Sequence, residues 1–224
     1  MLNSRTAVRL GGISGILFVV LVIPSFLSPP DSPIATSGTQ DVIDYFSDRQ
    51  DSILTLNGLL LIFAAFFFLW FLSMLHGVLQ DAEGEGYGFS SVLLAGGLLF
   101  IALVLAGAAV EIVYPATLAR FDNFQQDAQL GFLSLALSGW MYRFAFVGMA
   151  ALIAATSVVV LKSGVLPRWL GWAGLLVALV ALLRFLGPLS AWLTLLWVVV
   201  VSVLMLTGGV GSTGGPRTRT VRSS

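Results

Sequence analysis

Three charged side chains and one amide stand alone inside long apolar stretches of this 224-residue chain. The charges are Glu111, Arg143 and Arg184, and the amide is Asn57. A charged group at the centre of a membrane costs at least ~2.5–3.5 kcal/mol, so such residues normally pair with one another or line a functional site. Their types indicate charge pairing, ion or proton binding, or hydrogen bonding within a membrane.

The depth of these groups follows from counting along the helices that must carry them. Counted from the residues that mark one interface, Lys162, Arg168 and Ser91, all three charges lie about 24–30 Å along their helix axes. Small residues share their helix faces, which indicates that the charges face the bundle interior. We therefore predict that the four residues form one polar layer near the outer interface. Three roles stay open: a structural ion pair, which we favour, a ligand or ion site, and arginines that only reach the headgroups.

Composition excludes most enzymatic chemistry. The chain has no cysteine and one histidine, His76, which excludes thiol chemistry and metal sites built from cysteine or several histidines. It contains no HExxH, GxSxG or Walker motif. We expect no catalytic residue, no metal and no cofactor, and predict that the protein is not an enzyme. Basic and acidic residues balance at 11 each, so charge indicates no nucleic-acid partner.

The elements that must carry the polar layer are six apolar segments of 18 to 22 residues. About 20 helical residues cross a ~30 Å hydrocarbon layer, where the backbone must satisfy its own hydrogen bonds. We predict an all-α bundle of six transmembrane helices in a single domain, residues 1–207, followed by a disordered basic tail, residues 208–224. A cleaved signal peptide is the alternative for the first segment, but no small-residue cleavage site follows it. The predicted helices cover residues 10–27, 53–74, 92–113, 141–161, 169–186 and 189–206.

Basic residues set the predicted orientation. Arg5 and Arg9, the loop residues Lys162 and Arg168, and the arginines of the tail fall on one side of a six-helix arrangement. Because loops rich in Lys and Arg stay in the cytoplasm, both termini are predicted to be cytoplasmic, with the bundle in the plasma membrane. Residues expected to anchor the helices at the two interfaces are Trp140, Trp169, Trp172, Trp192 and Arg168.

The segment before the second apolar block is predicted to form a short amphipathic helix on the outer surface. Four aspartates recur at helical spacing between residues 41 and 51, while Val42, Ile43 and Phe46 occupy the other side. We favour a solvated acidic face. The alternative, a calcium site, lacks the spacing of an EF-hand loop.

The apolar stretch 130–162 is longer than a bilayer requires. As one straight helix it would span ~50 Å. Either the helix extends outward, or Ser138-Gly139 breaks it into an interfacial piece and a spanning piece. We favour the break.

The stretch LPRWLGW, residues 166–172, joins two of the predicted helices. Pro167 stops the first helix, Arg168 faces the headgroups, and Trp169 anchors the next. With its flanking residues, the turn resembles one found in small, uncharacterised multi-pass membrane proteins of actinobacteria and related bacteria. That resemblance implies a bacterial integral membrane protein with six helices, from a family of unknown function, and implies no catalytic residue.

These features favour a structural or accessory role through contacts with the lipid bilayer or a protein partner. The alternative is a small-solute or ion transporter that uses the polar layer. A membrane-embedded enzyme has least support, because the chain has one histidine and no pair of carboxylates on one membrane helix.

Overall fold

The computed structural model describes residues 4–27, 38–84, 88–121, 123, 127–183 and 188–208. Within these residues the regular structure is entirely helical. Arg184 and residues 209–224 of the predicted tail lie outside the described residues. In chain order the elements are α1 (Ser4–Leu27), α2 (Thr39–Thr55), the π-helix η1 (Leu56–Leu60), α3 (Leu61–Glu83), α4 (Phe89–Arg120), α5 (Ala128–Ser163), α6 (Arg168–Leu183) and α7 (Pro188–Thr207).

Five helical stretches of the described chain are long and apolar enough to cross a membrane. The sixth apolar helix, α6, has 16 described residues and is shorter. A helix suits this environment because all of its interior peptide groups bond within the same segment. The apolar helices therefore indicate a membrane protein. The spanning stretches are Thr6–Pro24, Asp51–Glu83, Phe89–Arg120, Ala128–Ser163 and Leu189–Thr207.

The predicted break at Ser138-Gly139 is wrong, because α5 runs without interruption for 36 residues. The Ser138 hydroxyl donates to the Leu135 carbonyl at 3.1 Å, one turn back in the same helix. The start of α5 is instead marked by Asp127, whose carboxylate accepts a hydrogen bond from the Gln129 N–H at 2.8 Å. Glycine weakens a helix by only about 1 kcal/mol, which is too little to end one that is packed along its length.

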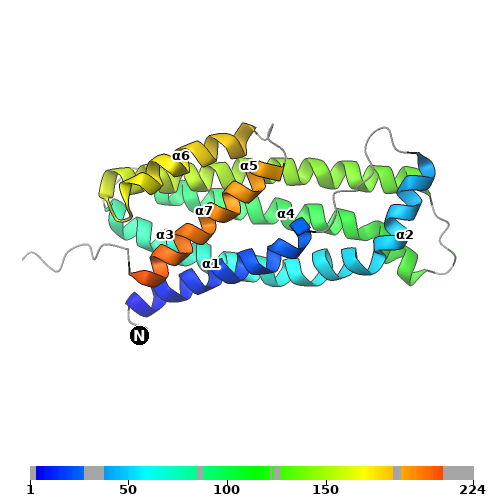
Figure 1. Ribbon diagram of the computed structural model, residues 1–224, viewed down its shortest axis with the longest axis horizontal. Helices are drawn as coiled ribbons and strands as arrows, with labels where there is room; N and C mark the ends of the chain where they lie inside the picture. Colours follow the sequence, from blue (N-terminus) through cyan, green and yellow to red (C-terminus); the bar gives the residue numbers. More distant parts are fainter. Residues whose placement is uncertain are drawn as a thin grey trace, which may run out of the picture.

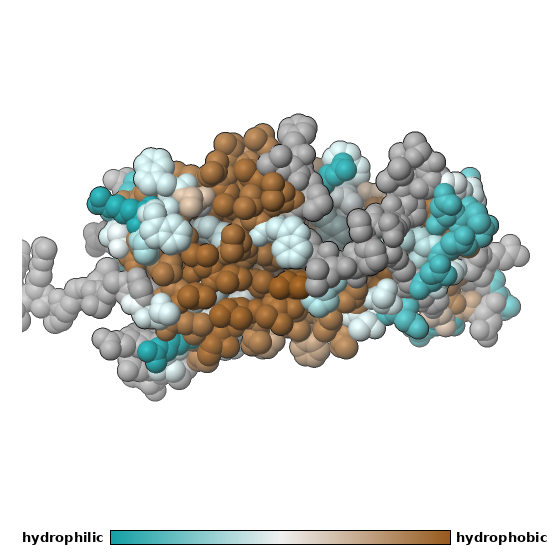
Figure 2. Space-filling view, in the orientation of Figure 1, coloured by the Kyte–Doolittle hydropathy of each residue, from teal (hydrophilic) through white to brown (hydrophobic). Residues whose placement is uncertain are grey.

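The helices differ in length, and this difference shapes the molecule (Figure 1). The stretch Asp51–Glu83, which contains the end of α2, η1 and α3, has 33 residues, and α4 and α5 have 32 and 36. Each measures about 50 Å along the chain of helix, whereas α7 has 20 residues and measures about 30 Å. In Figure 1, α1, α6 and α7 occupy one part of the bundle, and α3, α4 and α5 extend beyond them. Helix α2 lies across the end that they reach, which we call the α2 end. The hydropathy surface agrees, with hydrophilic side chains gathered at α2 and an apolar belt over α1, α6 and α7 (Figure 2).

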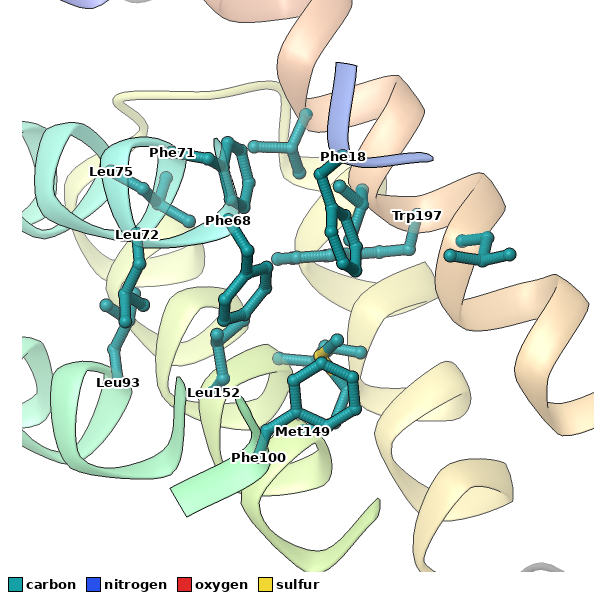
Figure 3. Close-up of a cluster of buried hydrophobic side chains, with 14 of the residues drawn as sticks. Phe18, Phe68, Phe71, Leu72, Leu75, Leu93, Phe100, Met149, Leu152 and Trp197 are labelled. Carbon is teal, nitrogen blue, oxygen red and sulfur yellow. The ribbon is translucent and has the colours of Figure 1, made fainter. Parts of the chain in front are cut away.

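One apolar core fills the bundle between α1, α3, α4, α5, α6 and α7. At its centre the ring of Phe68 lies 4.9 Å from that of Phe18 and 5.3 Å from that of Phe100 (Figure 3). Buried hydroxyls on α5 turn back to their own helix: Thr156 donates to the Leu152 carbonyl at 2.8 Å and Ser157 to the Ile153 carbonyl at 2.7 Å. The polar side chains of this core therefore make few links between helices.

Helices α4 and α5 approach most closely where two glycines face each other. A Cβ built on Gly148 would lie 2.5 Å from the Gly96 carbonyl oxygen and 2.7 Å from the Phe100 amide nitrogen. Both neighbours are backbone atoms, so they cannot move aside without moving α4. Such small-residue contacts let helix backbones pack together in a membrane, where no hydrophobic effect drives helices toward each other.

We predict that Gly148→Ala lowers the free energy of unfolding by about 1–3 kcal/mol, because the added methyl group pushes α4 and α5 apart. The measurement is unfolding of the purified protein in detergent, by heat or by denaturant. Gly139→Ala in the same helix is the matched control, since nothing lies within 4 Å of the Cβ position there. Equal effects of the two substitutions would contradict the close contact.

Candidate functional site

A carboxylate, a phenol and an amide from three elements meet near the α2 end. The Tyr142 hydroxyl of α5 donates a hydrogen bond to Glu111 Oε2 of α4 at 2.9 Å. The Asn57 side chain of η1 makes a second hydrogen bond to the same carboxylate. All three side chains are half-buried. We call these three residues the carboxylate cluster.

The π-helix η1 positions Asn57. A π-turn adds a residue to one turn of helix, and here the Leu61 N–H bonds to the carbonyl of Leu56, five residues back. The neighbouring Gly58 leaves η1 close to α4, since a Cβ there would lie 3.8 Å from Ile112 Cδ1, beside Glu111. Single π-turns inside α-helices occur frequently at functional sites, which makes this junction a site candidate on geometry alone.

Tyr142 reaches Glu111 because α4 offers it space one turn earlier. A Cβ on Gly107 would lie only 3.0 Å from Tyr142 Cε1, so the tyrosine ring occupies the room that a side chain would need. Tyr142 also shares its face of α5 with Ala145, Met149 and Leu152, which are all buried in the main core. The phenol is therefore held by packing as well as by its hydrogen bond.

Arg143 does not face the bundle interior, contrary to the expectation from sequence. Its side chain is exposed, and its guanidinium carbon lies 4.9 Å from the centre of the Trp140 ring. Successive residues of an α-helix are rotated by about 100°, so a register that turns Tyr142 toward Glu111 turns Arg143 away. The structure thus brings Glu111 and Asn57 together and leaves Arg143 outside their cluster. The predicted role of Arg184 stays a prediction, because that residue lies outside the described ones.

The tryptophans expected at the interfaces lie on the surface of the bundle. Their exposed fractions run from 39% for Trp192 to 68% for Trp172, with Trp140 and Trp169 between. Arg168 is exposed at the first position of α6. Such placement is compatible with contact to headgroups, and the anchoring role stays a prediction.

A second, smaller apolar core lies at the α2 end, beside the carboxylate cluster. Val42 and Phe46 of α2 are fully buried, and the Phe46 ring lies 4.7 Å from that of Tyr114 on α4. The aspartates at 41, 44, 48 and 51 are exposed, so the predicted amphipathic character of this helix is confirmed. Tyr45, on the same helix, is half-buried and packs against this second core.

The carboxylate of the cluster can hold a positive charge. Its one carboxylate is bonded by two neutral side chains, with no histidine or second carboxylate among the contacts found for it. Among the described residues, no group of three or more His, Cys, Asp or Glu side chains could hold a metal ion. A proton or a single small cation is the ligand that this chemistry allows.

Sequence reasoning missed Tyr142 and Tyr45. The available signal was the face that Tyr142 shares with residues three, seven and ten positions later, all of them buried. That signal is weak in α5, because apolar residues surround the helix on every side.

We predict that Tyr142→Phe lowers the free energy of unfolding by about 1–3 kcal/mol, because it removes a hydrogen bond to a half-buried carboxylate and keeps the ring. Thermal unfolding in detergent or lipid nanodiscs measures the change. The neighbouring exposed residue supplies the control: Arg143→Gln should change the stability by less than about 0.5 kcal/mol. A larger loss from Arg143→Gln than from Tyr142→Phe would show that the arginine, not the phenol, supports Glu111.

Comparison with known proteins assigns no role to these residues. No family model matches the chain, and neither does any curated protein or solved structure. The resemblance of the LPRWLGW turn to bacterial multi-pass proteins therefore stays a prediction. The role of the carboxylate cluster must be argued from its own contacts.

Proposed function

We propose that this chain is an integral protein of the plasma membrane with six spanning helices, both termini in the cytoplasm, and a structural or accessory role through contacts with lipid and a protein partner. The observation that carries this proposal is the filled apolar interior of the bundle. The α2 end then lies outside the cytoplasm and offers a surface for the partner.

The interior argues for a structural role over transport. Phenylalanine rings and aliphatic side chains from six helices pack against one another along the core, and the buried hydroxyls of Thr156, Ser157 and Thr194 bond within their own helices. A solute pathway needs a continuous series of polar groups or water. Among the described side chains, only Trp197 Nε1 and Ser202 Oγ are buried without a hydrogen-bond partner. These two groups do not form a series that reaches Glu111 near the α2 end.

The arrangement of the chain ends supports six crossings. In Figure 1 the first turn of α1 and the last turn of α7 lie at the same end of the bundle, as an even number of crossings requires. Helix α6 packs on α5 through glycines, and a Cβ on Gly171 would lie 2.6 Å from Leu161 Cγ. The 16 described residues of α6 measure about 24 Å, and the helices on either side of it along the chain are long enough to span.

The distribution of charge supports cytoplasmic termini. Lys162 and Arg168 are exposed at the turn between α5 and α6, at the end of the bundle where α1 begins. The exposed aspartates of α2 lie at the opposite end. The rule that basic loops stay in the cytoplasm therefore assigns the first end to the cytoplasm and the α2 end to the outside.

The part of the bundle beyond the membrane supports contact with a partner. Helices α4 and α5, with 32 and 36 residues, measure about 50 Å and exceed a ~30 Å hydrocarbon layer by about 20 Å. On the projecting part of α5, Leu130, Leu133 and Leu137 are exposed on one face, with Leu133 at 63%. Exposed apolar faces outside lipid are characteristic of surfaces that bind other proteins.

The topology can be tested by cysteine labelling, because the chain has no cysteine of its own. We predict that Asp48→Cys and Asn123→Cys react with a membrane-impermeant maleimide in intact cells, whereas Ser4→Cys and Ser224→Cys react only after permeabilisation. Reaction of Ser4→Cys and Ser224→Cys on opposite sides of the membrane would contradict six crossings.

The structural role can be tested by reconstitution. We predict that proteoliposomes carrying the wild-type protein leak sodium, potassium and protons no faster than protein-free vesicles, because the packed core leaves no route. Ion-sensitive fluorescent dyes measure the flux. A flux in the wild type that Glu111→Gln abolishes would instead establish the transporter alternative.

A further inference from the structure

We propose that the carboxylate cluster binds one small monovalent cation, a proton or an alkali metal ion, at Glu111. This inference goes beyond the structural role, since a resident cation at this place requires no pathway through the bundle.

The first argument is the charge around Glu111. Its two hydrogen-bond partners, the Tyr142 hydroxyl and the Asn57 side chain, are both neutral. Neutral donors stabilise a negative charge but do not cancel it. A half-buried carboxylate near the outer interface has lost part of its hydration, so neutralisation by a cation stabilises the folded state.

The described side chains on the surrounding elements supply no counter-ion. Arg120 lies nine residues beyond Glu111 at the end of α4, about 14 Å along the helix. Arg143 is exposed on α5, with its guanidinium carbon 4.9 Å from the centre of the Trp140 ring. Helix α3 has no Lys, Arg, Asp or Glu between Leu61 and Gln80, and His76 lies toward its other end. The titratable groups that α2 brings to this end are Asp41, Asp44, Asp48 and Asp51 on its exposed face and the phenol of Tyr45.

The second argument is the ligand chemistry of the cluster. A carboxylate, an amide carbonyl and a phenol are oxygen donors, which suit hard cations. In membrane proteins, small cations are commonly bound where a helix departs from regular α geometry. Here Asn57 sits in the π-turn, and Ile112, next to Glu111, packs against the second apolar core. One carboxylate matches one positive charge, which favours a monovalent cation over a divalent one.

The test is thermal unfolding of the full-length protein in lipid nanodiscs. Sodium chloride, potassium chloride and choline chloride are compared at equal ionic strength from pH 5 to pH 9. If the ligand is an alkali ion, sodium or potassium should raise the Tm of the wild type by about 2–6 °C over choline once the ion exceeds its Kd tenfold. If the ligand is a proton, acid should raise the Tm in all three salts.

Two variants make the result specific to the site. Glu111→Gln should abolish the response to ion or acid, because the amide carries no charge to neutralise. Asp48→Asn, which removes an exposed carboxylate from α2, should respond as the wild type does. The proposal is overturned if wild type and Glu111→Gln respond alike, or if neither acid nor salt changes the wild-type Tm.

The remaining alternative is an internal counter-ion. The side chains of Arg49 and Arg184 lie outside the described ones. If Arg49→Gln or Arg184→Gln creates a salt or acid response that the wild type lacks, Glu111 is paired internally and the proposal fails.

If Glu111→Gln cannot be purified, infrared difference spectra of the wild type replace it. A carboxyl band that changes with sodium or acid, and is shifted in Tyr142→Phe, supports the site, and the absence of such a change overturns it.

Discussion

A peptide group that leaves water for hydrocarbon must find its hydrogen bond within the protein, or it costs several kcal/mol. This requirement governs the chain at every level. It turns the apolar stretches into helices and gives the buried hydroxyls of Thr156 and Ser157 to the carbonyls of their own helix. It also leaves shape as the main source of specificity between helices. Specificity between the helices therefore comes from the backbone contact at Gly96 and Gly148 and from the aromatic packing around Phe68. In soluble proteins, polar pairs often supply it.

The unequal helix lengths divide the molecule into two apolar cores with different surroundings. The main core lies among six helices of the bundle, and the second core lies where α2 packs on the ends of α4 and α5. Burial of a side chain such as Phe46 stabilises by about 1.5–3 kcal/mol where water is the alternative, so the hydrophobic effect can hold α2 in place at the end of the bundle. The same effect has no counterpart inside the lipid layer.

The carboxylate cluster lies at the junction of these two cores. Ala108 and Ala145 of the main core and Ile112 of the second core flank it along α4 and α5. Three elements meet at Glu111: α4 carries the carboxylate and admits the Tyr142 ring at Gly107, α5 supplies Tyr142, and the π-helix η1 carries Asn57. A rigid frame around a single carboxylate is the arrangement expected for a site that holds one small ligand.

The sequence by itself determined the helical membrane class, the amphipathic face of α2 and the choice of Glu111 and Asn57 as polar residues within apolar segments. These are local properties, because they follow from the composition of each segment and from the spacing of apolar residues along it. Only the tertiary structure decided that α5 is unbroken, and that Tyr142 rather than Arg143 faces Glu111. Neighbouring residues differ by about 100° around a helix, and a helix that is apolar on every side has no periodic signal to fix its rotation. Contacts with α4 and η1 fix that rotation, and they join residues that are far apart along the chain.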